Sequence, residues 1–219
     1  MSRSTYFVGL DLGQSMDFTA IAVLERVELT GEWDAVMYAF RKTTALRLRY
    51  LERVALGTPY PEVVERVRQV VRAPELEGQC QLFVDATGVG RPVTDMLQRA
   101  GLGCRMWPVL ITSGQSEKSD GGYYMTPKRD LIIGLQVLLQ RGGLQIAAGL
   151  KEGETLVREM AEMRVKITPN RNEQYGTWRE GEHDDLVLAV ALACWGAGKV
   201  YPRQPAGDEA YWRQRDVGF

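Results

Sequence analysis

The stretch Tyr6-Phe7-Val8-Gly9-Leu10-Asp11-Leu12-Gly13 combines a nearly unbroken apolar run with a single acid. A run this apolar predicts a central β-strand buried on both faces, and Gly13 predicts the turn that follows it. An aspartate on such a strand is costly to ionise unless it has a hydrogen-bond partner, a bound cation or a chemical role. Asp11 is therefore the first candidate functional residue, and its role depends on the partners that the fold brings to it.

The composition is typical of a soluble globular protein with one compact domain. The chain has 219 residues, of which 45% are hydrophobic and 25% are charged. No apolar run approaches the roughly 20 residues that cross a bilayer. No signal-peptide core precedes Tyr6. We therefore expect a cytoplasmic protein without a membrane partner.

The charge balance and the cysteines limit the kinds of partner and of metal site that we expect. Lys and Arg total 27 against 28 Asp and Glu, so an anionic partner such as nucleic acid has to be held by a local patch or by a metal. Cys80, Cys104 and Cys194 lie far apart without CxxC spacing. This pattern argues against both a disulfide framework and a zinc site.

The hydrophobic pattern predicts an antiparallel meander followed by a βαβ unit. The meander consists of strands over 6–12, 19–27 and 33–41, with a turn at Gly31-Glu32 and a basic, irregular segment over 43–50. The elements expected after it are a helix over 61–72, a strand over 81–85, a helix from 91 to about 99, a strand over 104–111, a mobile loop over 112–124, a helix over 128–141, a strand over 144–147, a helix over 152–163, a β-hairpin formed by 164–168 and 174–178, and an apolar helix after His183-Asp184-Asp185. We expect residues 1–198 to form one domain and 199–219 a polar tail.

Three acidic positions in this order point to a metal site. Asp85 ends a second apolar strand, and Asp184 and Asp185 open the apolar last helix. Two acids at the ends of neighbouring strands, with a third from a helix packed over the sheet, cannot all stay ionised unless a cation holds them. Oxygen ligands without His or Cys favour Mg²⁺ or Mn²⁺. Two such ions roughly 4 Å apart suit phosphodiester hydrolysis.

Each of these residues also has a plainer interpretation. Asp11 could end its strand by hydrogen bonding into the following turn, and Asp85 could cap the turn after it. Asp184 could serve only as a helix N-cap, a position that favours a short side-chain oxygen. His183, the only histidine, is better explained as a helix-start residue than as a catalyst. The combination favours function because three coincidences would have to occur in the right order.

Four motifs in order resemble the nuclease domain of tailed-phage terminase large subunits. They are Gly9-Leu10-Asp11-Leu12-Gly13-Gln14-Ser15 with Asp17, Phe83-Val84-Asp85-Ala86-Thr87-Gly88-Val89-Gly90, Pro127-Lys128, and His183-Asp184-Asp185-Leu186 with its alanine-rich helix. The resemblance covers roughly residues 5–197. It implies an RNase H-like α/β fold, with a central mixed sheet of five or more strands flanked by helices and an added β-hairpin.

The resemblance also implies an activity and a set of site residues. The activity is metal-dependent cleavage of double-stranded DNA during genome packaging, with two Mg²⁺ or Mn²⁺ ions. The metal-binding and catalytic acids are then Asp11, Asp85 and Asp185, with Asp184 as an alternate or second ligand. Asp185 is preferred because Ala189 lies one turn below it, on the expected sheet-facing side of the helix. In a packaging motor the implied partners are DNA, the terminase ATPase domain, the small terminase subunit and the portal protein.

The sequence departs from whole terminase large subunits at one point. Those proteins carry an ATPase domain with a GxxxxGK[ST] phosphate-binding loop before the nuclease. Gly114-Gln115-Ser116-Glu117-Lys118 lacks the second glycine of that loop. We expect the chain to be either an excised nuclease domain or a free-standing relative, without motor function of its own.

DNA contact is expected from two basic clusters and one motif residue. The clusters lie between Arg41 and Arg53 and on the predicted hairpin, and either could instead be a solvated surface. The candidate DNA-binding residues are Arg47, Arg49, Lys128, Arg164, Lys166 and Arg171.

Three rival functions remain open at this stage. A Holliday-junction resolvase of the same fold is disfavoured because Leu188 stands where such enzymes usually carry an acid. An actin-like or sugar-kinase ATP-binding fold loosely matches the two glycine-containing motifs, but it needs two domains and a longer chain. A degenerate binding module is disfavoured because acids are intact at all three positions.

Overall fold

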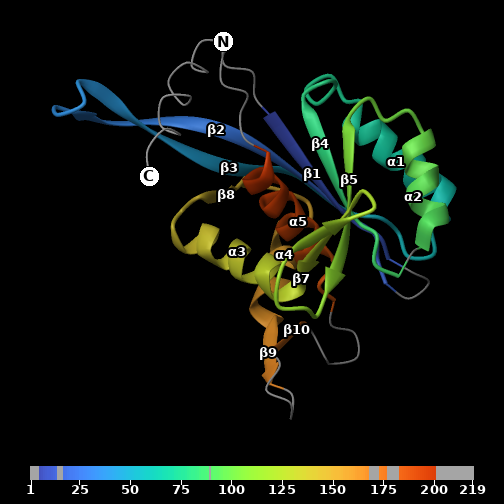
Figure 1. The fold of residues 1–219 in the computed structure, drawn as a ribbon. Helices are drawn as coiled ribbons and strands as arrows, with labels where there is room; N and C mark the ends of the chain where they lie inside the picture. Colours follow the sequence, from blue (N-terminus) through green and yellow to red (C-terminus); the bar gives the residue numbers. More distant parts are fainter. Residues whose placement is uncertain (1–4, 14–16, 89, 168–172, 177–182, 201–219) are drawn as a thin grey trace, which may run out of the picture.

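The computed structural model describes residues 5–13, 17–88, 90–167, 173–176 and 183–200. These residues form three layers, with a mixed β-sheet between two groups of helices (Figure 1). One group, α1 and α2, packs on one face of the sheet, and α3, α4 and α5 pack on the other. The predicted α/β architecture is confirmed.

The described part of the main sheet has eight strands in the order β6-β7-β5-β4-β1-β2-β3-β8. These strands are β1 (Thr5–Asp11), β2 (Ala20–Asp34), β3 (Ala39–Arg53), β4 (Cys80–Asp85), β5 (Arg105–Thr112), β6 (Lys118–Asp120), β7 (Tyr123–Pro127) and β8 (Leu144–Ile146). The helices are α1 (Tyr60–Val71), α2 (Gly90–Arg99), α3 (Lys128–Gln140), α4 (Gly153–Glu162) and α5 (Asp185–Lys199). A separate antiparallel hairpin, as predicted, is formed by β9 (Arg164–Ile167) and β10 (Glu173–Gly176).

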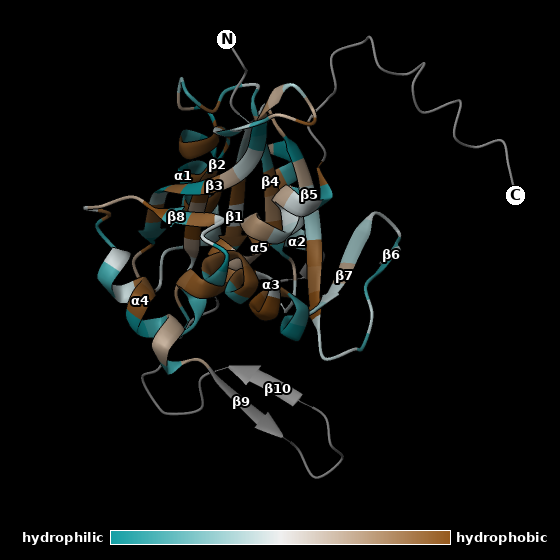
Figure 2. Ribbon diagram, turned by 90° about the vertical axis from the view of Figure 1, so that its left-hand side faces the viewer, coloured by the Kyte–Doolittle hydropathy of each residue, from teal (hydrophilic) through white to brown (hydrophobic). Residues whose placement is uncertain are grey.

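The two faces of β1 carry different side chains because residues alternate along a strand. Val8 and Leu10 join the core beneath α1 and α2. Phe7 joins the core beneath α3, α4 and α5, so Gly9 and Asp11 also face α5. Hydrophobic residues gather where the central strands meet α5 (Figure 2). The strand is therefore buried on both faces, as predicted, and its acid belongs to the α5 face.

Helix α5 approaches β1 and β4 closely because a glycine leaves room at one contact with each strand. A Cβ on Gly9 would lie 1.9 Å from the carbonyl oxygen of Ala189. A Cβ on Gly196 would lie 2.3 Å from the ring of Phe83. Both contacts hold the helix against the face that carries Asp11.

Among the described residues, none of the helices combines the length and apolarity needed to span a bilayer.

The sequence-based boundaries are wrong in two places. Residues 43–50, expected to be irregular, belong to β3, and the turn is near Tyr38 rather than at Gly31-Glu32. The segment 112–124, expected as a mobile loop, contains β6 paired antiparallel with β7. Glu117 holds this segment to α5, because it accepts a hydrogen bond from the indole of Trp195 (2.7 Å) and pairs with Lys199.

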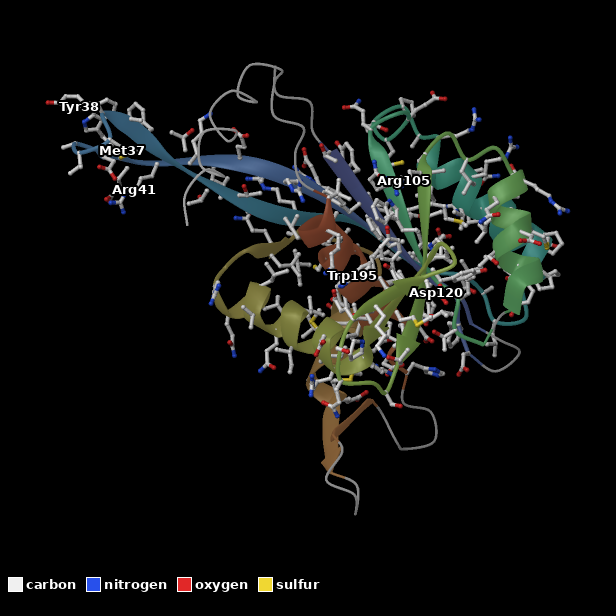
Figure 3. The ribbon with its side chains drawn as sticks, in the orientation of Figure 1. Met37, Tyr38, Arg41, Arg105, Asp120 and Trp195 are labelled. Atoms are coloured by element: carbon white, nitrogen blue, oxygen red, sulfur yellow. The ribbon has the colours of Figure 1, made fainter. Side chains whose placement is uncertain are left out.

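The β2–β3 hairpin extends well beyond the body of the protein (Figure 1). Met37 and Tyr38 lie at its far end, with Arg41 nearby (Figure 3). Met37 is 75% exposed and Tyr38 82% exposed. Trp33 and Phe40 pack edge-on against each other, with ring centroids 5.2 Å apart. Outside the core, the hydrophobic pattern does not constrain strand length. The prediction therefore ended the second strand at 27 instead of Asp34, and its third strand over 33–41 wrongly spans the observed turn at 35–38.

Candidate metal centre

Asp11 and Asp85 are brought together by strand pairing. Leu10 lies opposite Val84 in the parallel β1–β4 pair, so the acids that end the two strands are side by side. Their carboxyl groups are within hydrogen-bond reach of each other. The turn after β4 fixes Asp85, because Thr87 donates its backbone N–H to Asp85 Oδ1 (2.7 Å). Asp85 therefore does cap its turn, as the plainer interpretation proposed, and also faces Asp11.

Helix α5 supplies the third acid, Asp185. It lies near Asp11 because the distance from Ala189 to Asp185 along the helix is close to the distance from Gly9 to Asp11 along the strand. The helix runs antiparallel to β1, with Ala189 packed on Gly9. Four helical residues from Ala189 back to Asp185 span about 6 Å. Two strand residues from Gly9 to Asp11 span about 7 Å. Asp185 is thereby placed over Asp11, and only 6% of it is exposed.

Asp184 and Lys128 form an ion pair beside these acids. Lys128, the first residue of α3, donates to Asp184 Oδ2 at 2.6 Å. Although Asp184 occupies the N-cap position of α5, its side chain makes no capping hydrogen bond. The N-cap role therefore does not explain this acid, and Lys128 is a local counter-charge within the acid cluster.

Asp185 lies beside two cationic or potentially cationic side chains without a hydrogen bond to either. Its Oδ2 is 3.6 Å from Arg53 Nη2 and 3.6 Å from His183 Nδ1. In the described part of the chain, this buried oxygen has no hydrogen-bond partner. An unpartnered buried carboxylate oxygen is costly, and a bound cation would satisfy it.

Burial and mutual repulsion raise the pKa values of these acids. The pKa of Asp11 is raised well above its usual range by burial first, and then by Asp85, Asp185 and Asp184. The pKa of Asp85 is also raised, mainly by burial. Burial raises the pKa of Asp185 to about 6, while Arg53 and His183 act in the opposite direction. Acids with such environments cluster at functional sites.

The donor set suits a hard divalent cation, although the side chains are not arranged around one point. Among the residues that the structure describes, no three His, Cys, Asp or Glu side chains converge on a common coordination position. Asp184 is bonded to Lys128, which competes with a cation for that carboxylate. The oxygen-only ligands, their burial and the unpartnered Asp185 oxygen fit Mg²⁺ or Mn²⁺.

Without a divalent metal, the protein should lose stability as the pH rises from 5 to 7.5. The pKa of Asp185 is about 6 in the folded chain against 3.8 ordinarily, so the folded state binds more protons between these values, and stability falls as pH rises through them. Between pH 5 and 7.5 this shift corresponds to about 1.4 kcal/mol, or a fall of roughly 3–5 °C in melting temperature. The pKa of Asp11 is raised as well, so Asp11 should add to the fall. The measurement is thermal unfolding in chelator at both pH values. Asp185→Asn should reduce the fall in melting temperature, and the exposed control Asp95→Asn should not. Equal melting temperatures of the wild type at pH 5 and 7.5 would contradict this prediction.

The structure identifies two site residues that the sequence did not single out. Arg53 ends β3 next to Asp185, stacked over the ring of Phe18 at 4.7 Å. Glu159 on α4 pairs with Arg53 and accepts hydrogen bonds from the first turn of α5. Arg53 was visible only as one member of a basic cluster. Glu159 could have been noticed in the sequence, because it is an acid on the apolar face of a predicted helix.

The expected DNA-binding arginines of β3 do not line the acid cluster. Arg47 donates to Gln145 at 2.9 Å and lies six residues, or about 20 Å, along the strand from Arg53. Arg49 pairs with Glu25 at 2.6 Å beside a cavity of about 530 Å³ between the sheet and α1, on the face away from Asp11. Arg164 and Lys166 lie on β9, and Arg171 lies outside the described residues. DNA contact by these residues stays a prediction.

Solved structures with a similar fold exist, although comparison with protein families and curated proteins finds no match. No protein-family model matches the sequence, and no curated protein does. Among solved structures, the large terminase nuclease from thermophilic phage G20c aligns with a TM-score of 0.62 and 21% identity, over 88% of this chain and 82% of that one. The nuclease domain of the large terminase subunit gp2 of bacterial virus Sf6 aligns at 0.59 and 14%, over 89% of each chain. The HK97 bacteriophage large terminase aligns at 0.51 and 12%, over 88% of this chain but 39% of that one.

At these identities the likeness is one of fold. The mixed sheet flanked by helices is an α/β fold of the RNase H-like kind, as expected. More narrowly, the chain has the fold found in the nuclease domains of large terminases.

Proposed function

We propose that this chain is a metal-dependent endonuclease that cleaves double-stranded DNA, acting in viral genome packaging. The observation that carries the proposal is the buried cluster of Asp11, Asp85 and Asp185, with Asp184 beside it. The cluster lies in a fold shared with phage large-terminase nucleases. Buried carboxylates that raise one another's pKa values would be stabilised by divalent cations, and DNA phosphates would be drawn to the same ions.

Mg²⁺ or Mn²⁺, in two sites, is the proposed cofactor. The G20c nuclease has been determined with bound magnesium, and the Sf6 domain with manganese. In this chain Asp11, Asp85 and the α5 acids would hold the ions. The ions would activate water and stabilise the leaving oxygen. Lys128 lowers the pKa values of Asp11 and Asp85, which favours the ionised form that binds metal.

The proposed setting is the cytoplasm of a phage-infected host cell, within a packaging assembly. The HK97 large terminase is more than twice as long as the part that this chain matches. A terminase ATPase domain, a small terminase subunit and a portal protein are the proposed partners. Arg47, Arg49, Arg164, Lys166 and Arg171 remain the proposed DNA contacts outside the acid cluster.

The purified chain should nick or cut supercoiled plasmid DNA in Mg²⁺ or Mn²⁺ with little sequence preference, as measured by gel electrophoresis. Asp85→Asn and Asp185→Asn should each abolish cutting, because each removes a charged ligand. Asp95→Asn is the matched control, since Asp95 is exposed on α2, and it should cut at the wild-type rate. Full activity of Asp85→Asn, or cutting that persists in EDTA, would overturn the proposal.

A further inference from the structure

Glu159 is a buried acid on α4 whose two carboxylate oxygens are both used inside the protein. Its side chain is only 3% exposed. One oxygen, Oε2, accepts hydrogen bonds from the backbone N–H groups of Leu186 (3.1 Å) and Val187 (3.3 Å). The other, Oε1, accepts from Arg53 Nη2. One side chain therefore joins α4, the end of β3 and the beginning of α5.

The bonds to α5 replace a cap that the helix does not receive from its own sequence. An aspartate at the N-cap ordinarily accepts a hydrogen bond from the second or third amide of its helix. In α5 those amides belong to Leu186 and Val187, and Glu159 takes both. The carboxylate of Asp184 consequently bonds to Lys128 instead of capping the helix. Because Glu159 caps the helix, the carboxylates of Asp184 and Asp185 are not used for capping and can take part in the acid cluster.

The ion pair with Arg53 affects Asp185 as well. Arg53 Nη2 is 3.6 Å from Asp185 Oδ2, which is beyond a good hydrogen bond. The same nitrogen is bonded to Glu159. With its guanidinium directed to Glu159, Arg53 leaves the Asp185 oxygen without a hydrogen bond.

We infer that Glu159 is a positioning residue for metal binding, an inference that rests on the metal site proposed above. Glu159 caps α5 in place of Asp184, and it holds Arg53 so that the guanidinium does not close on Asp185. The Asp185 oxygen then remains available to a divalent cation. When the charge of Glu159 is removed, Arg53 pairs with Asp185 and competes with the ion.

Glu159→Gln tests this competition directly. The amide oxygen of Gln can still accept from the α5 backbone, but its NH₂ group then faces Arg53 and repels it toward Asp185. The affinity for Mn²⁺ should fall about 10- to 100-fold, the usual cost of changing a group that orients a metal ligand. The measurement is calorimetric titration of Mn²⁺ into the full chain after metal removal. Glu154→Gln, an exposed change on the same helix, is the matched control and should bind as the wild type does.

A second substitution separates this role from a structural one. Arg53→Gln in the Glu159→Gln protein should return the Mn²⁺ affinity to within about threefold of wild type, because the competitor is gone. A merely structural role predicts further weakening instead. Unchanged affinity in Glu159→Gln, or no recovery in the double variant, overturns the inference.

If Glu159→Gln does not fold, the single variant Arg53→Gln tests the inference instead. It should bind Mn²⁺ at least as tightly as the wild type, and weaker binding overturns the inference. A wild-type chain that binds no Mn²⁺ would overturn the proposed metal site itself. That result differs from a wild type that binds Mn²⁺ and is unaffected by Glu159→Gln, which overturns the positioning role alone.

Discussion

Asp11→Asn should abolish DNA cleavage and, in the absence of metal, make the protein more stable. Cleavage should fall at least about a thousandfold, since a metal ligand contributes several kcal/mol to the transition state. Stability should rise because Asn removes an acid whose pKa is raised by burial and by three neighbouring carboxylates. At pH 7.5 the gain should appear as a higher melting temperature of the variant in chelator.

Both readouts of Asp11→Asn should be taken on the same preparation. Plasmid cleavage is measured in Mn²⁺, and thermal unfolding is measured in chelator and again in Mn²⁺. The ion should stabilise the wild type more than the variant, because the variant lacks one of the proposed ligands. An acid that served only the fold would give the opposite pattern, with cleavage retained and melting lowered. Either of those results would remove Asp11 from the site.

Gly9→Ala should destabilise the protein by about 3 kcal/mol or more, an overpacking cost that the neighbours cannot relieve cheaply. The added Cβ would lie 1.9 Å from the carbonyl oxygen of Ala189 and 3.0 Å from the backbone nitrogen of Ala193. Both atoms belong to the helix backbone, so α5 as a whole has to move. The same displacement would carry Asp185 away from Asp11, so cleavage should also fall at temperatures where the variant is folded.

Gly134→Ala is the matched control for this substitution. Gly134 lies inside α3, and a Cβ there would meet nothing within 4 Å. An alanine in an open helix position should stabilise the protein by about 0.5–1 kcal/mol. Denaturant unfolding in chelator compares the two variants. A Gly9→Ala protein as stable as the wild type would contradict the close packing of α5 on β1.

The fold and the acid cluster were largely predictable because they depend on short, strongly patterned segments. The apolar runs that end in Asp11 and Asp85 predict two buried strands, and pairing of such strands places their ends together. The apolar helix beginning at Asp185 could be buried only against that sheet. Alternation along β1 and helical spacing along α5 then determine which side chains meet.

The remaining features were not predictable, because they depend on contacts between distant segments or on surface strands. Arg53 and Glu159 are 106 residues apart, and neither has a local pattern that reveals the other. Asp184 is paired with Lys128, whereas Asp185 Oδ2 has no hydrogen-bond partner among the described residues. This difference depends on Lys128 and on Glu159, which supplies the helix cap. The length of the β2–β3 hairpin was missed because no core contact restricts its outer residues.

The position of β1 in the sheet has a consequence for access to its acid. From β1 the chain turns back antiparallel into β2 on one side, while β4 pairs parallel with β1 on the other. The segments that leave Asp11 and Asp85 therefore diverge, one toward β2 and one toward α2. In open α/β sheets, ligands bind at such topological switch points, at the carboxyl ends of the strands. Two ordinary chain reversals in opposite directions thus place this acid pair at a natural ligand-binding position of the fold.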